Sequence, residues 1–175
     1  MTSPFIFDCA TMLRGGTMPE QRTQTGPSPV RIGAAMIAIA KDSDVTVAAT
    51  LTPLGEGIMV DADVTATLTG ECVRCLTELA PEQTFHISEV FAASPDFIQG
   101  DEAGDDEDEL PEVVDNRIDL LQSVIDAVGL ELPFSPACDS FGLDCAEGDV
   151  PEPDGVSGEE NDLVDPRWAG LEKFK

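Results

Sequence analysis

Apolar and polar side chains alternate along the run Val60-Asp61-Ala62-Asp63-Val64-Thr65-Ala66-Thr67-Leu68-Thr69. Successive side chains of a β-strand point to opposite faces, so this run places its valines, alanines and leucine on one face and its aspartates and threonines on the other. The run from Val45 to Leu51 alternates in the same way. The connection between the two runs, Pro53-Leu54-Gly55-Glu56-Gly57, is rich in glycine, as hairpin connections are. The sequence therefore predicts two adjacent antiparallel strands with one polar and one apolar face.

Two further runs extend this predicted sheet. Residues 31–40 form an apolar run of strand length, and residues 84–93 alternate around Phe85, Ile87 and Phe91. Strands that are linked by hairpins and have polar outer faces imply an antiparallel β-sheet, or a barrel partly closed from one.

The N-terminal residues predict less regular structure. Asp8 can cap a single helical turn, which Gly15 and Gly16 would end. Residues 17–29 are rich in Pro, Thr, Gln and Gly, and this composition predicts a loop.

An amphipathic helix is predicted near residues 118–128. Its apolar side chains recur at spacings of three and four residues, at Ile118, Leu121, Val124, Ile125 and Val128. Asp115 or Asn116 can cap its beginning, and Gly129 or the Leu132-Pro133 step can end it. Because the apolar stripe must be buried, we expect this helix to cover the apolar face of the sheet, and the predicted fold class is α+β.

Acidic segments divide the chain. Nine of the fifteen residues from Asp101 to Asp115 are acidic. Such a segment buries too little apolar surface to offset the entropy of ordering it. We therefore predict one α+β domain over residues 1–145, with an acidic disordered insert at about 99–115. An acidic disordered linker over 146–164 and a short helical tail over 165–175 follow.

The net charge limits the partners and the location of the protein. The chain carries 35 Asp and Glu against 9 Lys and Arg, a formal net charge of −26. Nucleic-acid affinity usually comes from Lys and Arg, so the charge argues against a broad phosphate-binding surface. A basic protein partner, or a contact through a small basic patch, fits the charge better. We see no signal peptide and no apolar window close to the roughly 20 residues that span a membrane, so we expect a cytoplasmic protein.

Four of the five cysteines are candidates for a metal site. Cys72 and Cys75 are two residues apart in Cys72-Val73-Arg74-Cys75, directly after the predicted strand, which is half of a tetrahedral zinc site. The second half would come from Cys138 and Cys145, whose spacing is loose for a zinc knuckle. The alternatives are four free thiols, or a redox pair at Cys72 and Cys75, although no thioredoxin-like βαβ pattern surrounds it. Cys9 has no partner in sequence and is interpreted as a small apolar residue.

No catalytic motif is visible, and we expect a protein that is not an enzyme. The single histidine, His86, lies in a predicted strand without a nucleophile beside it. The chain contains no GxGxxG, phosphate loop, HExxH or GxSxG pattern. The acidic runs carry many carboxylates but no scaffold that would hold them in the fixed geometry of general acid–base catalysis.

The last eleven residues differ in character from the acidic linker before them. They contain the only tryptophan and three basic residues, and Trp168, Leu171 and Phe174 are three residues apart. They predict either a short helix that packs on the edge of the sheet or a basic-apolar docking peptide. The residues predicted to bind a partner are Arg74, Arg167, Trp168, Leu171, Lys173 and Lys175.

Four motifs, in the same order and at compatible separations, resemble the YceD family of large ribosomal RNA subunit accumulation proteins. The first is the segment from Asp8 to Gly16, and the second is the strand that leads into Cys72-Val73-Arg74-Cys75-Leu76. The third is the helix that ends in Leu132-Pro133-Phe134-Ser135-Pro136-Ala137-Cys138, and the fourth is Asp165-Pro166-Arg167-Trp168-Ala169-Gly170-Leu171. Many members carry further cysteines after the third motif, where this chain has Cys145.

The resemblance implies a role in making or stabilising large-subunit ribosomal RNA, and it implies no catalytic residues. Together with the charge, it suggests binding of a basic ribosomal protein, an assembly factor or an rRNA precursor particle, with no membrane and no small-molecule substrate. Two alternatives remain, an acidic zinc-binding regulatory or chaperone module and a nuclease that acts on rRNA.

Overall fold

The computed structural model describes residues 3–94, 97 and 111–145. Its centre is the predicted hairpin of β5 (Asp44–Pro53) and β6 (Gly57–Glu71), in which Val47 lies opposite Val64. The backbone N–H of Leu54 donates to the carbonyl of Gly57 over 2.8 Å and closes the turn. The alternating runs therefore form adjacent antiparallel strands, as predicted.

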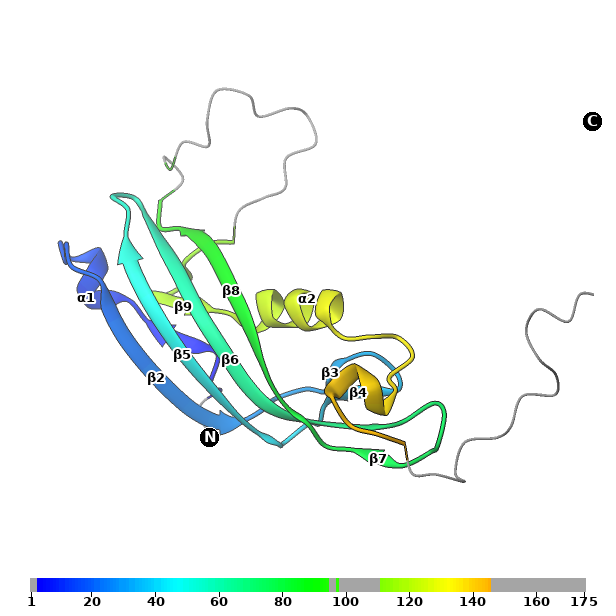
Figure 1. Ribbon diagram of the computed structural model, residues 1–175. Helices are drawn as coiled ribbons and strands as arrows, with labels where there is room; N and C mark the ends of the chain where they lie inside the picture. The colour runs from blue at the N-terminus through cyan, green and yellow to red at the C-terminus, as the bar shows by residue number, and fades with distance from the viewer. Residues whose placement is uncertain (1–2, 95–96, 98–110, 146–175) are drawn as a thin grey trace, which may run out of the picture.

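Strands on both sides of this hairpin complete an antiparallel sheet (Figure 1). β8 (Glu82–Ala92) pairs with β6 over its whole length, and β2 (Glu20–Pro27) pairs with the outer edge of β5. Within the described residues the sheet stays open and does not close into a barrel. Of the two predicted alternatives, the open sheet is the correct one.

The end of β6 carries a second set of short strands. Beyond residue 67, β6 pairs with β4 (Ile37–Ile39) on one side and with β7 (Glu78–Leu79) on the other. β3 (Ile32–Gly33) extends β4 as an antiparallel hairpin. The longest strand of the structure thus belongs to both halves of the sheet.

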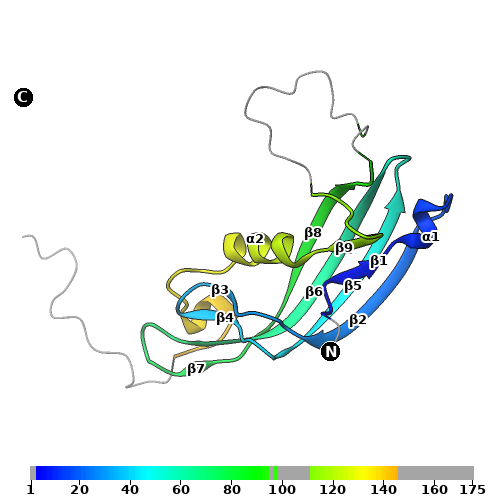
Figure 2. The same cartoon turned by 180° about the vertical axis from the view of Figure 1, so that it is seen from behind.

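One face of the sheet is covered and holds the core (Figure 2). The apolar residues of β5 and β6 that point to this face, from Val45 to Leu51 and from Ile58 to Leu68, are at most 3% exposed. The cover consists of α2 (Leu121–Glu131) and a two-stranded ribbon of β1 (Ile6–Asp8) and β9 (Arg117–Asp119). The α+β class and the covering helix are confirmed.

The predicted helix begins later than its apolar spacing suggested. Ile118 lies in β9, opposite Phe7, and not in the helix. A carboxylate oxygen of Asp119 accepts a hydrogen bond of 2.9 Å from the N–H of Leu121 in the first turn. Asp115 and Asn116, the predicted caps, instead adopt positive φ angles of 50° and 60° and form the turn before β9. A buried residue of a β-strand can match a helical spacing by chance. The prediction therefore placed the beginning of the helix too early.

Of the two predicted ends of α2, the Leu132-Pro133 step is confirmed. Gly129 lies inside the helix and does not end it. Leu132 is extended, with φ −76° and ψ 135°, as expected for a residue that precedes proline.

Two local predictions were wrong. Residues 17–29 contain the strand β2 rather than only a loop, because an edge strand tolerates a polar sequence when one partner strand supplies its hydrogen bonds. The inward side of β2 is polar but satisfied, since Gln24 Nε2 donates to the Ile6 carbonyl over 3.1 Å. Residues 31–40 form the β3–β4 hairpin rather than one strand, because the chain turns after Gly33, whose φ is 131°.

The N-terminal turn is confirmed. α1 (Ala10–Leu13) begins after Asp8, whose carboxylate accepts a hydrogen bond of 2.9 Å from the N–H of Ala10. The N–H groups of Gly15 and Gly16 both donate to the carbonyl of Met12 over 3.1 Å and end the turn.

Several predicted segments lie outside the described residues. These are residues 99–110 of the acidic insert, the linker over 146–164 and the tail over 165–175. The last residues of the predicted insert are described, and the N–H of Val113 donates to the Ala92 carbonyl over 2.8 Å. No helix in the described part of the chain is long and apolar enough to cross a lipid bilayer.

Candidate metal centre

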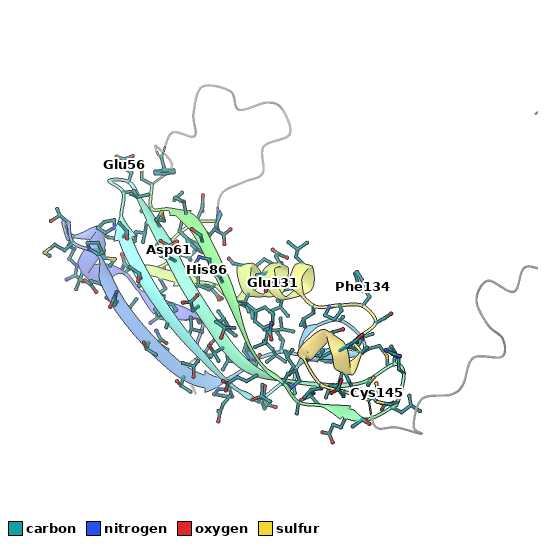
Figure 3. The ribbon with its side chains drawn as sticks, in the orientation of Figure 1. Glu56, Asp61, His86, Glu131, Phe134 and Cys145 are labelled. Carbon is teal, nitrogen blue, oxygen red and sulfur yellow. The ribbon has the colours of Figure 1, made fainter. Side chains whose placement is uncertain are left out.

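The structure brings the four candidate cysteines together at one end of the sheet. The sulfur atoms of Cys72 and Cys145 are 3.9 Å apart, and those of Cys75 and Cys138 are 3.6 Å apart. All four sulfur atoms lie within 4.8 Å of one another. Figure 3 places Cys145 at this end, next to the loop between β6 and β7.

A tight turn after β6 presents the first cysteine pair. The N–H of Leu76 donates to the carbonyl of Cys72, and the N–H of Cys72 donates to the carbonyl of Thr77, each over 2.9 Å. Leu76 adopts a positive φ of 58°, which reverses the chain toward β7. Both sulfur atoms therefore come from one loop that backbone hydrogen bonds hold in a tight turn.

A second turn returns Cys145 to the cluster. A short 3₁₀ helix over Cys138–Phe141 is followed by Gly142, which has a left-handed φ of 70°. The N–H of Leu143 donates to the carbonyl of Cys138 over 2.9 Å, so the chain doubles back. This reversal explains how a pair that looked too widely spaced in sequence can converge on one point.

The two loops are joined by contacts other than sulfur. The N–H of Val73 donates to the carbonyl of Pro136 over 2.9 Å. On the surface, the Arg74 guanidinium lies 3.7 Å from a carboxylate oxygen of Asp139. A backbone hydrogen bond and an exposed ion pair thus hold the loop of Cys138 and Cys145 against the loop of Cys72 and Cys75. The exposed ion pair contributes little to the stability of this contact.

The sulfur positions fit a tetrahedral zinc ion. Zinc–sulfur bonds of about 2.3 Å in a tetrahedron require sulfur atoms about 3.8 Å apart. The Cys75–Cys138 and Cys72–Cys145 distances, 3.6 and 3.9 Å, bracket that value. Cys72, Cys75 and Cys138 are at most 9% exposed. A set of four converging sulfurs, three of them from buried cysteines, is the arrangement of a structural zinc site. In such a site the ion would cross-link the two loops and would leave no position for a substrate.

The two cysteine pairs differ in their electrostatic surroundings. Hydrogen bonding from the backbone N–H of Cys75, with further N–H groups, lowers the pKa of Cys72 to about 6. Hydrogen bonds from the hydroxyl and the N–H of Thr77 lower the pKa of Cys75. Burial raises the pKa of Cys138 and of Cys145. The first pair therefore favours the thiolate that a metal needs, and the second pair would release protons on metal binding.

Cys9 is separate from this cluster. It is fully buried in the core, and its sulfur donates to the Phe7 carbonyl over 3.6 Å. Burial raises its pKa to about 11. It behaves as the small apolar residue predicted from the sequence.

The other residues singled out in the sequence do not join the cluster. His86 lies on the outer face of the sheet, where its Nδ1 atom is 2.9 Å from a carboxylate oxygen of Asp63. Arg74 is half-exposed beside the cysteines. The remaining predicted partner residues, Arg167, Trp168, Leu171, Lys173 and Lys175, lie outside the described residues.

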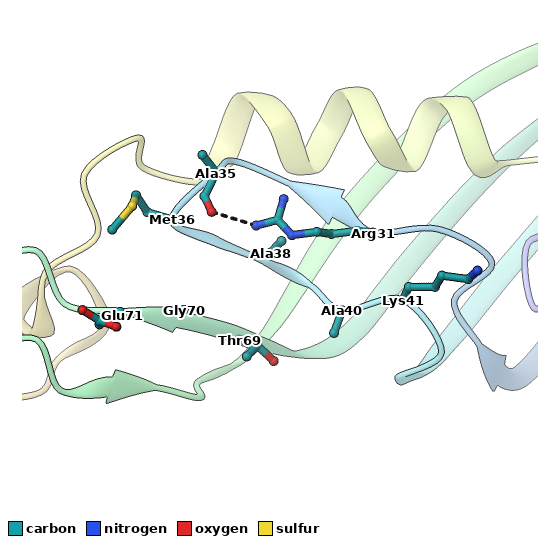
Figure 4. Close-up of a pocket in the computed structure, with 9 residues that line it drawn as sticks. All are labelled: Arg31, Ala35, Met36, Ala38, Ala40, Lys41, Thr69, Gly70 and Glu71. Atoms are coloured by element: carbon teal, nitrogen blue, oxygen red, sulfur yellow. Dashed lines mark hydrogen bonds between the residues drawn. The ribbon is translucent and has the colours of Figure 1, made fainter.

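The sequence did not reveal a groove beside the cysteine end (Figure 4). It has a volume of about 490 Å³, and Arg31, Lys41, Thr69 and Glu71 supply its polar side chains. These residues come from the β3–β4 hairpin and from β6, which are far apart in sequence. Only the pairing of β4 with β6 brings them together.

The fold and the cysteine cluster define a small α+β domain with a closed four-cysteine corner. The chain belongs to the YceD family, because the family model described as "Large ribosomal RNA subunit accumulation protein YceD" matches residues 60–175. The matched region includes most of β6, all of α2 and all four clustered cysteines. Membership supports a general role connected with the ribosome.

Similar proteins occur in mycobacteria. The uncharacterized proteins Rv2926c of Mycobacterium tuberculosis and Mb2951c of Mycobacterium bovis are each 40% identical to this chain, over 98% of this chain and 81% of their own length. The uncharacterized protein ML1660 of Mycobacterium leprae is 36% identical, over 98% of this chain and 77% of its own. No solved structure matches the chain.

Proposed function

We propose that the protein is a non-enzymatic factor in the accumulation of large-subunit ribosomal RNA. It acts by binding a basic ribosomal protein, an assembly factor or an rRNA precursor particle in the cytoplasm. The observation that carries this proposal is the family match over residues 60–175, which spans the central strand, the covering helix and the cysteine corner.

The charge of the chain supports a cationic partner. With 35 acidic and 9 basic residues, the protein attracts basic ribosomal components and repels free polyanions.

Exposed apolar side chains at the cysteine end support direct contact with a partner. Leu130, Phe134 and Leu76 are 88%, 83% and 69% exposed. Large apolar groups that stay in water are typical of interaction sites, and the acidic surroundings would add electrostatic attraction. Phe134 points away from the body of the protein at the end of α2 (Figure 3).

The described site chemistry supports a binding role rather than catalysis. The four cysteines are mutually satisfied in a closed cluster, and the His86–Asp63 pair lies on an exposed sheet face with more than half of each side chain in water. A general acid or base works best in a pocket that excludes water and fixes the substrate.

Depletion of the protein tests the proposal. We expect less large-subunit rRNA, unchanged small-subunit rRNA and co-sedimentation of the tagged protein with large-subunit precursor particles. Replacing Leu76 and Phe134 by serine should weaken this co-sedimentation. The matched control replaces Met18 and Leu54, which are 76% and 45% exposed, by serine at the opposite end. Unchanged large-subunit rRNA after complete removal of the protein would overturn the proposal.

A second candidate function is a zinc-binding regulatory or chaperone module that is unrelated to ribosomes. The four sulfur atoms within 4.8 Å favour it. It requires about one zinc per chain together with normal rRNA levels after depletion. Reduced large-subunit rRNA would decide against it.

A further inference from the structure

The loops that carry the cysteine cluster also carry an exposed apolar patch. Its four large side chains are between 41% and 83% exposed, and they are Val73, Leu76, Phe134 and Leu143. The N–H of Val73 donates to the carbonyl of Pro136 over 2.9 Å, which holds the loop of Leu76 against the segment of Phe134. Leu143 lies in the turn that returns the chain to the cluster, and its N–H donates to the Cys138 carbonyl. Large apolar side chains that gather in water are typical of a surface that another segment covers.

The long strands of the sheet offer no comparable surface. None of the large apolar side chains that are exposed among the described residues lies in β2, β5, β6 or β8. The outer face of the sheet is instead polar, as the hydrogen-bonded pairs of Asp63 with His86 and of Asp61 with Ser88 show. A segment with an apolar face therefore finds a better match in the patch than on the sheet or along its edge.

The tail over residues 165–175 has the composition of such a segment. It lies outside the described residues, and its sequence combines three large apolar side chains at steps of three with three basic side chains. The apolar residues are Trp168, Leu171 and Phe174, and the basic residues are Arg167, Lys173 and Lys175. Tryptophan in particular is favoured in the centre of contact surfaces.

The charge around the patch suits this tail. Segments 71–79 and 130–145 contain five exposed acidic residues, Glu71, Glu78, Glu131, Asp139 and Asp144. The basic residue in these two segments, Arg74, already lies 3.7 Å from a carboxylate oxygen of Asp139. The tail carries three basic against two acidic residues, whereas the whole chain has a net charge of −26. The acidic surroundings of the patch therefore attract the tail and repel most of the rest of the chain.

The length of the connection limits which surface the tail can reach. The last described residue, Cys145, lies at the cysteine end itself (Figure 3). A chain as long as the linker over 146–164 has a root-mean-square span of roughly 25 Å. Met18 and Leu54, the exposed apolar side chains at the opposite end, lie beyond the 15 residues of β6, which is about 50 Å of strand. The patch is therefore the nearer apolar surface, and a tether of this length gives the tail an effective concentration on the order of millimolar.

We propose that the tail over residues 165–175 docks on this patch of its own chain. Trp168, Leu171 and Phe174 pack on the apolar side chains, and the basic residues of the tail lie beside the surrounding carboxylates. The family match over residues 60–175 includes both the patch and the tail. The inference goes beyond the proposed function and does not rest on it. A ribosomal partner that binds Leu76 and Phe134 would have to displace the tail.

The fluorescence of Trp168 tests the proposal in the full-length protein. The chain has one tryptophan and no tyrosine, so its emission reports on the tail directly. We expect emission at a shorter wavelength, and weaker quenching by acrylamide, than in the same protein unfolded in urea. The double variant Leu76→Ser with Phe134→Ser should raise the ratio of undocked to docked tail at least about tenfold and move both signals toward their values in urea.

A matched variant and a dilution series separate the alternatives. Met18→Ser with Leu54→Ser removes two exposed apolar side chains at the opposite end and should leave both signals unchanged. Circular dichroism confirms that each variant is folded. Emission of the unaltered protein equal to that in urea would overturn the proposal and leave the patch for a separate partner. Equal shifts in the two double variants would place the tail elsewhere. Signals that change on dilution, together with a dimer in sedimentation, would assign the patch to the tail of a second copy.

Discussion

Replacing Cys138 by serine should abolish the stabilisation of the protein by zinc. Cys138 is 3% exposed, and its sulfur lies 3.6 Å from that of Cys75, so serine would remove one of four ligands from a closed set. Serine is a poor zinc ligand because its hydroxyl stays protonated. The remaining three sulfurs would hold the ion much more weakly.

The expected size of the effect follows from the linkage between binding and folding. At a free zinc concentration one hundred times Kd, binding to the folded state alone adds about 2.7 kcal/mol to the free energy of unfolding. For a chain of 175 residues, each kcal/mol raises Tm by about 2 to 4 °C. Zinc should therefore raise the Tm of the unaltered protein by about 5 to 10 °C, and a chelator should reverse the rise.

Cys9 provides the matched control for this experiment. It is also a fully buried cysteine but lies in the core, away from the cluster. The variant Cys9→Ala should have a lower Tm without metal, yet it should keep the full zinc-dependent rise and one zinc per chain by elemental analysis. The variant Cys138→Ser should lose both the zinc-dependent rise in Tm and the bound zinc. A rise of equal size in Cys138→Ser, or no rise in the unaltered protein, would refute the assignment of these cysteines to a zinc site.

Three further outcomes can be measured by urea unfolding. Phe85→Ala should lower the free energy of unfolding by about 3 to 5 kcal/mol because Phe85 is fully buried, whereas Asp63→Ala on the exposed face should lower it by less than about 1 kcal/mol. Gly70→Ala should destabilise the protein by about 1 to 3 kcal/mol, because the new Cβ would lie 2.6 Å from a backbone oxygen. Gly129→Ala should stabilise the protein by up to about 1 kcal/mol, because Gly129 lies inside α2 and its new Cβ would meet no atom within 4 Å. Burial raises the pKa of Cys9 from 9.0 to about 11, so the folded state holds this proton more tightly than the unfolded state does. The resulting contribution to the free energy of unfolding is complete below pH 9 and is lost as the pH rises from 9 to about 11. Over that interval the unaltered protein should lose about 2 to 3 kcal/mol more than Cys9→Ala, and equal losses would contradict this reasoning.

Alternation was the most reliable signal in the sequence. The runs 45–51 and 60–69 placed β5 and β6, and the buried faces of both strands agree with the pattern. The period of two is reliable here because one face of the sheet is covered and the other is not. Where burial was incomplete, the signal failed, and the polar edge strand β2 was interpreted as a loop.

The helix start was misjudged because of one residue. Ile118 satisfies the spacing of the α2 stripe, yet it is buried in β9 against the sheet. A pattern of apolar residues cannot distinguish two elements that bury their side chains in the same core. The turn at Asp115 and Asn116 leads directly into β9, and left-handed conformations at such residues are common in turns.

The candidate site was predicted as a set of residues but not as a geometry. The sequence identified all four clustered cysteines, and only the turn at Gly142 shows why Cys145 reaches the others. The groove lined by Arg31, Lys41 and Glu71 was not predicted, because only the pairing of β4 with β6 brings these residues to one site. Contacts between distant segments carry no local signature in sequence.

The two parts of β6 pair with different strands, and this difference affects which part of the protein unfolds locally. Residues 58–66 pair with both β5 and β8, whereas residues 68–71 pair with the short strands β4 and β7. The cysteine end is therefore a small cooperative unit that can unfold locally while the larger sheet stays folded. Its backbone amides should exchange with deuterium sooner than those of the clamped part, and a bound ion that ties the two loops together would slow that exchange without affecting the rest of the strand.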